Sequence, residues 1–205
     1  MMIRNIWAVG RNYADHNAEM KSETPKEPLI FLKAGSCASV NSTEIVLPYW
    51  TTEVHHEVEL ALKLNSSLQV IEGAVALDLT ERSLQSKAKS KGEPWTLSKS
   101  FTGACAVSAF FTLRRWEEMA DLRLRLWVND ELKQEGRTSQ MLFNCETLMN
   151  HIYDKFPLCA GDLILTGTPA GVGPLKDGDR VKAGIEGQIT HSWKVIKEVA
   201  PKPQS

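Results

Sequence analysis

The stretch VHHEVELALKL (residues 54–64) carries the strongest structural signal in the chain. In its second part, apolar residues alternate with Glu57, Glu59, Ala61 and Lys63. An alternation with period two is typical of a β-strand that has one face in a core. Both glutamates should therefore point to the same side, roughly 6 to 7 Å apart, because each residue advances the strand by about 3.3 Å.

Two carboxylates on one face of a strand can be interpreted in two ways. They can form the solvated polar face of an edge strand, or they can converge on a cation. Without a cation the pair is costly, because like charges 4 Å apart repel by about 4 kcal/mol at an effective dielectric constant near 20. Evidence from the rest of the sequence is needed to choose between the two interpretations.

The composition is that of an ordinary globular protein. The chain has 205 residues, 42% hydrophobic and 24% charged, which suits one domain, 1–205, with a sizeable core. The net charge of −1 favours no nucleic-acid partner. We find no apolar run of the 18 or so residues that span a bilayer and no signal peptide, so we expect no membrane association. The expected location is cytoplasmic, or organellar after processing. The cysteines are too widely spaced to indicate a zinc knuckle or a disulfide framework: Cys37, Cys105, Cys145 and Cys159.

Most of the expected elements are short strands. We predict strands at 3–9, 29–33, 57–64, 73–79, 122–128, 162–166, 180–185 and 188–199, with a loop over 35–43. The strand at 29–33 should be buried, because it is mostly apolar. Thr80 should cap a helix that ends near residue 90, and residues 138–153 have helical spacing. The polar segment 11–20 has room for one or two helical turns. Many strands with few helices predict a mainly β (α+β) fold.

Asp78 supplies a third carboxylate. It ends an apolar strand just before Thr80, a place where an aspartate either supports a turn or belongs to a functional site. Together with Glu57 and Glu59, it would make an all-oxygen site. Oxygen ligands select Mg²⁺ or Mn²⁺ over zinc, and they also suit Ca²⁺.

Three further polar residues could hold an anionic substrate. Arg82 and Gln85 are three residues apart on a predicted helix and therefore share a face. Lys99 follows a turn-prone stretch at 91–94. Singly, each is an ordinary surface residue; beside a cation, they would bind anions and stabilise an oxyanion.

His16 and Glu19 lie on one side of a predicted helical turn. A carboxylate that orients an imidazole is the usual way to make a general base near neutral pH. Such a pair also occurs as a simple surface contact, so its meaning depends on its surroundings.

The glycine-rich stretch GTPAGVG (167–173) is not a Walker loop, because no Gly-Lys-Ser/Thr follows it. Its backbone N–H groups and the Thr168 hydroxyl could still bind a carboxylate. This stretch is therefore a candidate wall of the site.

Six short motifs follow one another along the chain: GRNY (10–13), FLK (31–33), HHEVEL (55–60), ALDLT (76–80), WTLSKSF (95–101) and TGTPAGVGP (166–174). In this order they resemble the fumarylacetoacetate hydrolase family, above all its small acylpyruvase and oxaloacetate decarboxylase branch. The resemblance covers nearly the whole chain. It implies a β-rich fold built around a rolled sheet, and usually a homodimer.

The resemblance also implies roles for individual residues. Mg²⁺ would be held by the residues that match Glu57, Glu59 and Asp78. His16 and Glu19 would form a water-activating dyad on a mobile lid. The other implied residues would line the substrate pocket: Arg11, Lys33, Arg82, Gln85, Lys99 and Thr168.

The sequence departs from the family pattern at three points. Alanine stands at position 34 where proline is usual after Phe-Leu-Lys, and Thr102 stands where aspartate is common. The connector between Glu59 and Asp78 is clearly shorter than the family leads us to expect. Either a surface helix has been lost there, or a stretch of the chain is missing.

The resemblance implies a hydrolase that splits acylpyruvates (2,4-dioxo acids) into pyruvate and a carboxylic acid. His16 would activate a water, and Lys99 and Gln85 would stabilise the oxyanion. The same enolate forms when oxaloacetate loses CO₂, so one site could run both reactions. Two alternatives stand beside this prediction: an isomerase or decarboxylase of homoprotocatechuate-pathway dienes, and an inactive binding module on the same fold.

The segment 12–22 should be mobile in the empty protein. It is polar, has weak helix propensity and offers little apolar surface to offset its ordering entropy. We therefore expect His16 to lie far from the carboxylates until a ligand closes the segment over the site.

Overall fold

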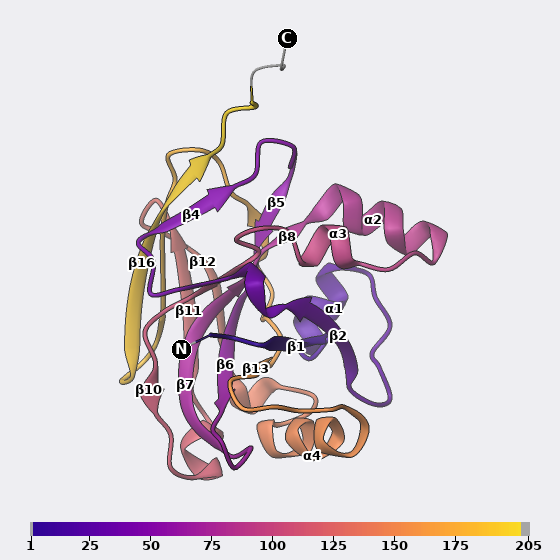
Figure 1. Cartoon of the computed structure of the whole chain (residues 1–205), viewed down its shortest axis with the longest axis vertical. Helices are drawn as coiled ribbons and strands as arrows, with labels where there is room; N and C mark the ends of the chain where they lie inside the picture. The colour runs from indigo at the N-terminus through magenta and orange to yellow at the C-terminus, as the bar shows by residue number, and fades with distance from the viewer. Residues whose placement is uncertain (1, 202–205) are drawn as a thin grey trace.

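Two curved β-sheets and a small third one make up most of the computed structural model, which describes residues 2–201 (Figure 1). Among these residues the first sheet has eight strands, in the order β2 (Leu29–Ala34), β1 (Asn5–Gly10), β13 (Leu163–Leu165), β6 (Val58–Leu64), β7 (Val70–Asp78), β9 (Cys105–Val107) and β3 (Ala38–Val40), with β10 (Phe111–Thr112) paired to β7. The second contains β12 (Glu131–Arg137), β11 (Arg123–Val128), β15 (Arg180–Ile185), β16 (Ile189–Lys197) and β4 (Glu44–Leu47). The third joins β14 (Gly173–Pro174), β5 (Val54–His56) and β8 (Thr80–Glu81). Residues 1 and 202–205 of the predicted domain lie outside the described part.

The helices are short and lie around the sheets. They are α1 (Ala14–Glu19), α2 (Arg82–Lys91), α3 (Thr96–Lys99) and α4 (Cys145–Lys155), with 3-10 turns η1 (Gly35–Cys37), η2 (Trp116–Met119) and η3 (Thr138–Gln140). Figure 1 shows α2 and α3 together, well separated from α4. The prediction of a mainly β (α+β) fold with a rolled sheet and a few short helices is confirmed.

The core lies where β6 and β7 of the first sheet face strands of the second. Its centre is built from leucines that have no exposed surface, such as Leu60 and Leu62 of β6 and Leu124 and Leu126 of β11. Burying one such side chain stabilises the fold by about 1.5 to 3 kcal/mol. This packing makes β6 a rigid platform for any polar residue that it carries.

Strand β6 is more deeply buried than its sequence pattern suggests. All seven of its residues are buried, because β6 lies between β13 and β7 in the middle of its sheet. The alternation therefore does not separate a core face from a solvent face. It separates an apolar face from a buried polar face that carries Glu59 and Lys63. The interpretation as a solvated edge strand is wrong.

The short connector between Glu59 and Asp78 is a tight hairpin. Strands β6 and β7 pair directly with each other in antiparallel register. The Oδ1 atom of Asn65 accepts hydrogen bonds from the backbone N–H groups of Ser67 at 2.9 Å and Gln69 at 2.8 Å, which stabilises the turn. The chain thus passes from β6 into β7 without an intervening helix.

The predicted helix over 138–153 is interrupted. It divides into η3 and α4, and Asn144 caps α4 by accepting a hydrogen bond from Thr147 N at 2.8 Å. Between the two, Leu142 N donates to the Asn12 carbonyl and Phe143 N to its side chain, both at 2.8 Å. These long-range bonds compete with the helical pattern that the local sequence favours.

Two other local predictions differ from the structure. Strand β2 was expected to be buried, but it is an edge strand in which only Lys33 is buried. The expected loop over 35–43 contains η1 and β3, because β3 pairs with β9 at the other edge of the sheet. Both differences arise from sheet order, which local composition does not encode.

Glu81, not Thr80, caps helix α2. Its buried carboxylate accepts hydrogen bonds from the backbone N–H of Leu84 at 2.6 Å and Glu53 at 3.0 Å, and from the Thr52 hydroxyl at 2.7 Å. Burial opposes ionisation, but these bonds outweigh it and lower the pKa of Glu81 to about 2. Glu81 therefore fixes where α2 starts and which way its first turn faces.

We predict that Glu81→Gln lowers the free energy of unfolding by about 2 to 3 kcal/mol at pH 7. Because the folded pKa lies below the unfolded value of about 4.3, this contribution is complete above about pH 5 and is lost as the pH falls towards 2. Urea unfolding at pH 7 and pH 3 measures the difference, with the exposed Glu93→Gln as the control. An equal loss at both pH values would contradict the role of the charge.

Candidate active site

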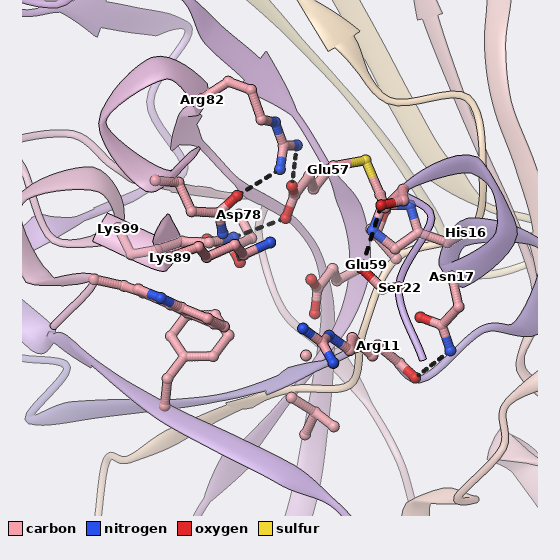
Figure 2. A pocket seen from close by; sticks show the side chains of 17 residues that line it. Arg11, His16, Asn17, Ser22, Glu57, Glu59, Asp78, Arg82, Lys89 and Lys99 are labelled. Carbon is pink, nitrogen blue, oxygen red and sulfur yellow. Dashed lines mark hydrogen bonds and ion pairs between the residues drawn. The ribbon is translucent and has the colours of Figure 1, made fainter. Parts of the chain in front are cut away.

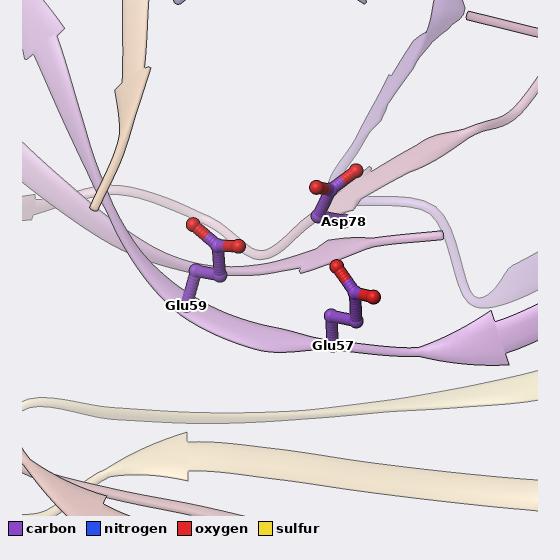
Figure 3. Close-up of side chains that lie close together, drawn as sticks. All are labelled: Glu57, Glu59 and Asp78. Atoms are coloured by element: carbon purple, nitrogen blue, oxygen red, sulfur yellow. The ribbon is translucent and has the colours of Figure 1, made fainter. Parts of the chain in front are cut away.

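Three carboxylates converge where β5, β6 and β7 meet (Figure 3). Glu57 lies in the break between β5 and β6, Glu59 is in β6, and Asp78 ends β7. One oxygen of each carboxylate lies within 4.8 Å of the others. Their exposed fractions are 4%, 2% and 1%. Carboxylates this deeply buried need positive charge nearby.

Three cationic side chains neutralise two of the carboxylates. Lys99 Nζ donates to Glu57 Oε2 at 2.8 Å and to Asp78 Oδ2 at 2.6 Å. Arg82 donates to Glu57 Oε1 at 2.5 Å, and Lys33 donates to Asp78 Oδ1. Burial disfavours the charged form of Glu57, but Lys99 and Arg82 more than compensate and hold its pKa well below its usual range. Glu57 is therefore ionised.

Glu59 has no such partner within residues 2–201. Its Oε2 accepts a hydrogen bond from Gly167 N at 2.6 Å, and no lysine or arginine pairs with it there. Burial, together with the nearby charges of Asp78 and Glu57, raises the pKa of Glu59 well above its ordinary value. Among the described residues, Glu59 therefore lacks an ion-pair partner of its own. A divalent cation would supply one, and carboxylates are ligands that Mg²⁺ and Mn²⁺ prefer.

Lys33 does not line the pocket, contrary to our expectation. Its side chain is completely buried, and Nζ also donates to the Ala104 carbonyl at 2.8 Å. The contact with Asp78 makes Lys33 a support for this carboxylate rather than a substrate ligand.

The pocket beside the carboxylates brings the other predicted residues together (Figure 2). In Figure 2, His16 lies on one side and Lys99 and Arg82 lie on the other, with Glu57 and Glu59 between them. The remaining predicted residues that line the pocket are Asp78, Arg11, Gln85 and Thr168. Glu19 does not line it but contacts His16, which does.

Sequence reasoning missed Lys89, which also lines the pocket. Its Nζ lies 5.3 Å from the centre of the Trp95 ring, another residue of the pocket wall. Lys89 stands four residues after Gln85 and seven after Arg82, so helical spacing places all three on one face of α2. This helical spacing is the sequence signal from which Lys89 can be predicted to lie in the site.

Arg82 orients the amide of Gln85. Arg82 Nη1 donates to Gln85 Oε1 at 2.7 Å, as the predicted shared helical face allows. Because the carbonyl oxygen is engaged, the NH₂ group of Gln85 is left to serve as a donor in the pocket.

His16 and Glu19 form the predicted pair. His16 Nδ1 lies 3.2 Å from Glu19 Oε2, and Glu19 also accepts a hydrogen bond from Gly171 N at 3.1 Å. A carboxylate only accepts, so the neutral imidazole carries its proton on Nδ1 and Nε2 is left as the base.

The structure places His16 in the pocket, and this differs from the remote position that we expected. Helix α1 is held by two asparagines that are almost completely buried. Asn12 Nδ2 donates to the Thr166 carbonyl at 2.8 Å, and Asn17 Nδ2 donates to the Arg11 carbonyl at 3.0 Å. Buried polar contacts, together with the buried ring of Tyr13, therefore order this segment.

The sequence model described as "Fumarylacetoacetate (FAA) hydrolase C-terminal" matches residues 5–195, which is most of the chain. The chain belongs to the fumarylacetoacetate hydrolase family. Known relatives support this assignment over most of the chain. The oxaloacetate tautomerase FAHD1 of Mus musculus, a mitochondrial protein, is 43% identical over 202 residues, which cover 94% of this chain and 91% of the relative.

Two other proteins to which this chain is similar bear on the chemistry. The mitochondrial oxaloacetate decarboxylase of Dictyostelium discoideum is 41% identical over 198 residues, with 91% of each chain covered. The crystal structure of fumarylpyruvate hydrolase from Pseudomonas aeruginosa in complex with Mn²⁺ and pyruvate has a TM-score of 0.89 and 28% identity, covering 96% of this chain and 91% of that one. These similarities support an enzyme of this family.

The comparisons leave the predicted location open. Two of these relatives are named as mitochondrial. Between residues 2 and 201, no helix has the length and apolar character to cross a membrane. The cytoplasmic location stays a prediction.

We predict that Glu59→Gln stabilises the cation-free protein and reduces the stabilisation that a cation provides. In chelator, the variant should melt above the wild type, by about 2 to 4 °C for each kcal/mol of repulsion removed. Addition of Mg²⁺ or Mn²⁺ should raise the melting temperature of the variant less than that of the wild type, because the variant lacks one carboxylate ligand. Calorimetry should show at least about a tenfold loss of cation affinity for this variant and for Glu57→Gln.

The control for this experiment is Glu53→Gln, because about half of the Glu53 side chain is exposed and it does not line the pocket. This variant should respond to cations as the wild type does. Unchanged cation affinity in both pocket variants would exclude the carboxylate cluster as the cation site.

We further predict that Mg²⁺ and oxalate together slow backbone hydrogen exchange across 12–22 at least about tenfold. Oxalate mimics the pyruvate enolate, and α1 buries only Asn17, so ligand contacts should add much of its stability. The turn at 186–188 serves as the unaffected reference. Strong and equal protection with and without ligand would mean that the segment is preformed.

Proposed function

We propose that this chain is a divalent-cation-dependent enzyme that stabilises the enolate form of small 2-oxo acids, hydrolysing acylpyruvates and acting on oxaloacetate. The observation that carries this proposal is the Glu59 carboxylate, which has no ion-pair partner within residues 2–201, beside Glu57 and Asp78 in the pocket that His16 also lines. A bound Mg²⁺ would polarise the carboxylate and keto oxygens of the substrate. We expect a substrate with a carboxylate group, because lysine and arginine side chains line the rest of the pocket.

The chain's own residues bind and orient the substrate. Arg82, Lys89 and Arg11 offer positive charge to a carboxylate in the pocket. Lys99 and the free NH₂ of Gln85 can donate to an oxyanion at the carbon under attack. A well-placed donor of this kind is worth about 3 to 4 kcal/mol of transition-state stabilisation.

His16 supplies the base. Its Nε2 takes the proton from a water that attacks the C4 carbonyl of an acylpyruvate, while Glu19 holds the Nδ1 proton and stabilises the imidazolium. The bond between C3 and C4 then breaks, and the electron pair forms the pyruvate enolate. Decarboxylation of oxaloacetate yields the same enolate without a hydrolytic water.

Oxaloacetate tautomerisation is a second candidate, favoured by the 43% identity to a protein that bears this name. Interconversion of keto and enol forms needs a proton moved at C3, and His16 is the base that faces the pocket. Tautomerisation should therefore depend on His16, as hydrolysis does.

We predict that His16→Ala depresses acetylpyruvate cleavage by about 10² to 10⁴, the usual effect of removing a general base. Oxaloacetate decarboxylation should fall much less, because it needs no activated water. Pyruvate release with Mg²⁺ measures both reactions, and His151→Ala on α4, outside the pocket, is the control.

The outcomes separate the competing functions. Equal loss of both activities in His16→Ala would show that His16 does something other than activate water. Cation binding without turnover of acetylpyruvate or oxaloacetate would favour the inactive binding module, and turnover of homoprotocatechuate-pathway dienes would favour the isomerase. The homodimer stays a prediction that sedimentation can check.

A further inference from the structure

Gln134 is a buried amide on a strand whose other side chains are mostly exposed. It lies in β12, at the edge of the second sheet, and only 1% of its surface is exposed. Leu126 pairs with Gln134 but Trp127 pairs with Leu132, so Lys133 is an extra residue in the ladder. A β-bulge of this kind redirects the side chain that follows it. It turns Gln134 towards the first sheet.

All four hydrogen-bonding positions of the Gln134 amide are used. Oε1 accepts from Val58 N at 3.0 Å and lies 2.9 Å from His56 Nδ1. Nε2 donates to the Pro169 carbonyl at 2.9 Å and to Thr168 Oγ1 at 2.8 Å. Because Val58 N can only donate and the Pro169 carbonyl can only accept, the amide has one possible orientation.

This orientation decides what the Thr168 hydroxyl can do. Thr168 accepts a hydrogen bond from Gln134, so its own hydrogen is left to donate. Within the described residues, the acceptor available to this hydroxyl is the Pro169 carbonyl. It lies 3.5 Å from Thr168 Oγ1 and already accepts a hydrogen bond from Gln134. Thr168 lines the pocket, where an anionic ligand is a better acceptor.

The loop that carries Thr168 is pressed onto β12 on both sides of Gln134. A Cβ atom on Gly136 would lie 2.6 Å from Pro169 Cβ, and one on Gly171 would lie 2.0 Å from the Lys133 carbonyl oxygen. The close approach leaves the loop little freedom to move away from Gln134.

We propose that Gln134 is a positioning residue that makes the Thr168 hydroxyl a hydrogen-bond donor to the carboxylate of a bound 2-oxo acid. The inference rests on the proposed function for the identity of the ligand. Gln134 itself does not line the pocket, and it acts through Thr168.

A double-mutant cycle with oxalate as the probe tests this inference. Calorimetry on the full chain with excess MgCl₂ gives the oxalate affinity without turnover. Gln134→Glu keeps the acceptor for Val58 N but turns the Thr168 hydroxyl towards the new carboxylate. It should weaken oxalate binding about tenfold, the worth of one hydrogen bond. In a Thr168→Val background, the same change should have less than about a twofold effect.

Two further variants complete the design. Thr168→Ser keeps the hydroxyl, so it should bind oxalate as the wild type does and keep the full sensitivity to Gln134→Glu. Gln140→Glu is the matched control, because Gln140 is exposed and needs only its acceptor oxygen, which binds Arg137 N at 2.7 Å. If Gln134→Glu does not fold, Gln134→Met removes the same donor and should show the same dependence on Thr168.

The results distinguish the inference from the function on which it rests. If Gln134→Glu lowers oxalate affinity equally in the wild-type and Thr168→Val backgrounds, Gln134 has a general structural role and the inference is overturned. Unchanged affinity in Gln134→Glu would also overturn it, while the proposed function stands. A wild-type chain that binds no oxalate with Mg²⁺ would overturn both.

Discussion

The rest of the structure depends on the burial of three carboxylates within 4.8 Å of one another. Such a cluster is stable only if the surrounding chain supplies compensating charge. Lys99 and Arg82 do this for Glu57, and Lys33 and Lys99 do it for Asp78. No ion pair of this kind reaches Glu59 within residues 2–201, and the proposed cation would supply the missing partner. The buried Glu59 carboxylate would thus lower the stability of the cation-free protein and bind the proposed cation.

The fold serves this cluster by placing its supports on different elements. The middle position of β6 removes the glutamate face from solvent, and the hairpin into β7 brings Asp78 beside it. Glu81 sets the start of α2, which directs Arg82 and Gln85 into the pocket. The charged groups are therefore held by the hydrogen bonds and packing of the framework, not by one another alone.

The loop 167–173 joins three parts of the site. Gly167 N binds Glu59, the Thr168 hydroxyl faces the pocket, and Gly171 N binds Glu19. Glycine is needed at position 167, where φ is 98° and a Cβ atom would lie 2.7 Å from Asn12 Cβ. A single loop held against β12 thus connects the proposed cation ligand, the substrate contact and the base, so that a displacement of the loop would affect all three.

The sequence by itself determined the relations that depend on local periodicity. Strand spacing placed Glu57 and Glu59 together, and helical spacing paired His16 with Glu19 and predicted a shared face for Arg82 and Gln85. Only the tertiary structure decided that β6 is buried on both faces, that Lys33 supports Asp78, and that Gln134 reaches Thr168. The contact between Lys33 and Asp78 joins distant strands of one sheet, and the contact between Gln134 and Thr168 joins a strand of the second sheet to a loop. Their partners are chosen by sheet order, register and a β-bulge, which the packing of the whole chain sets and no short stretch of residues encodes.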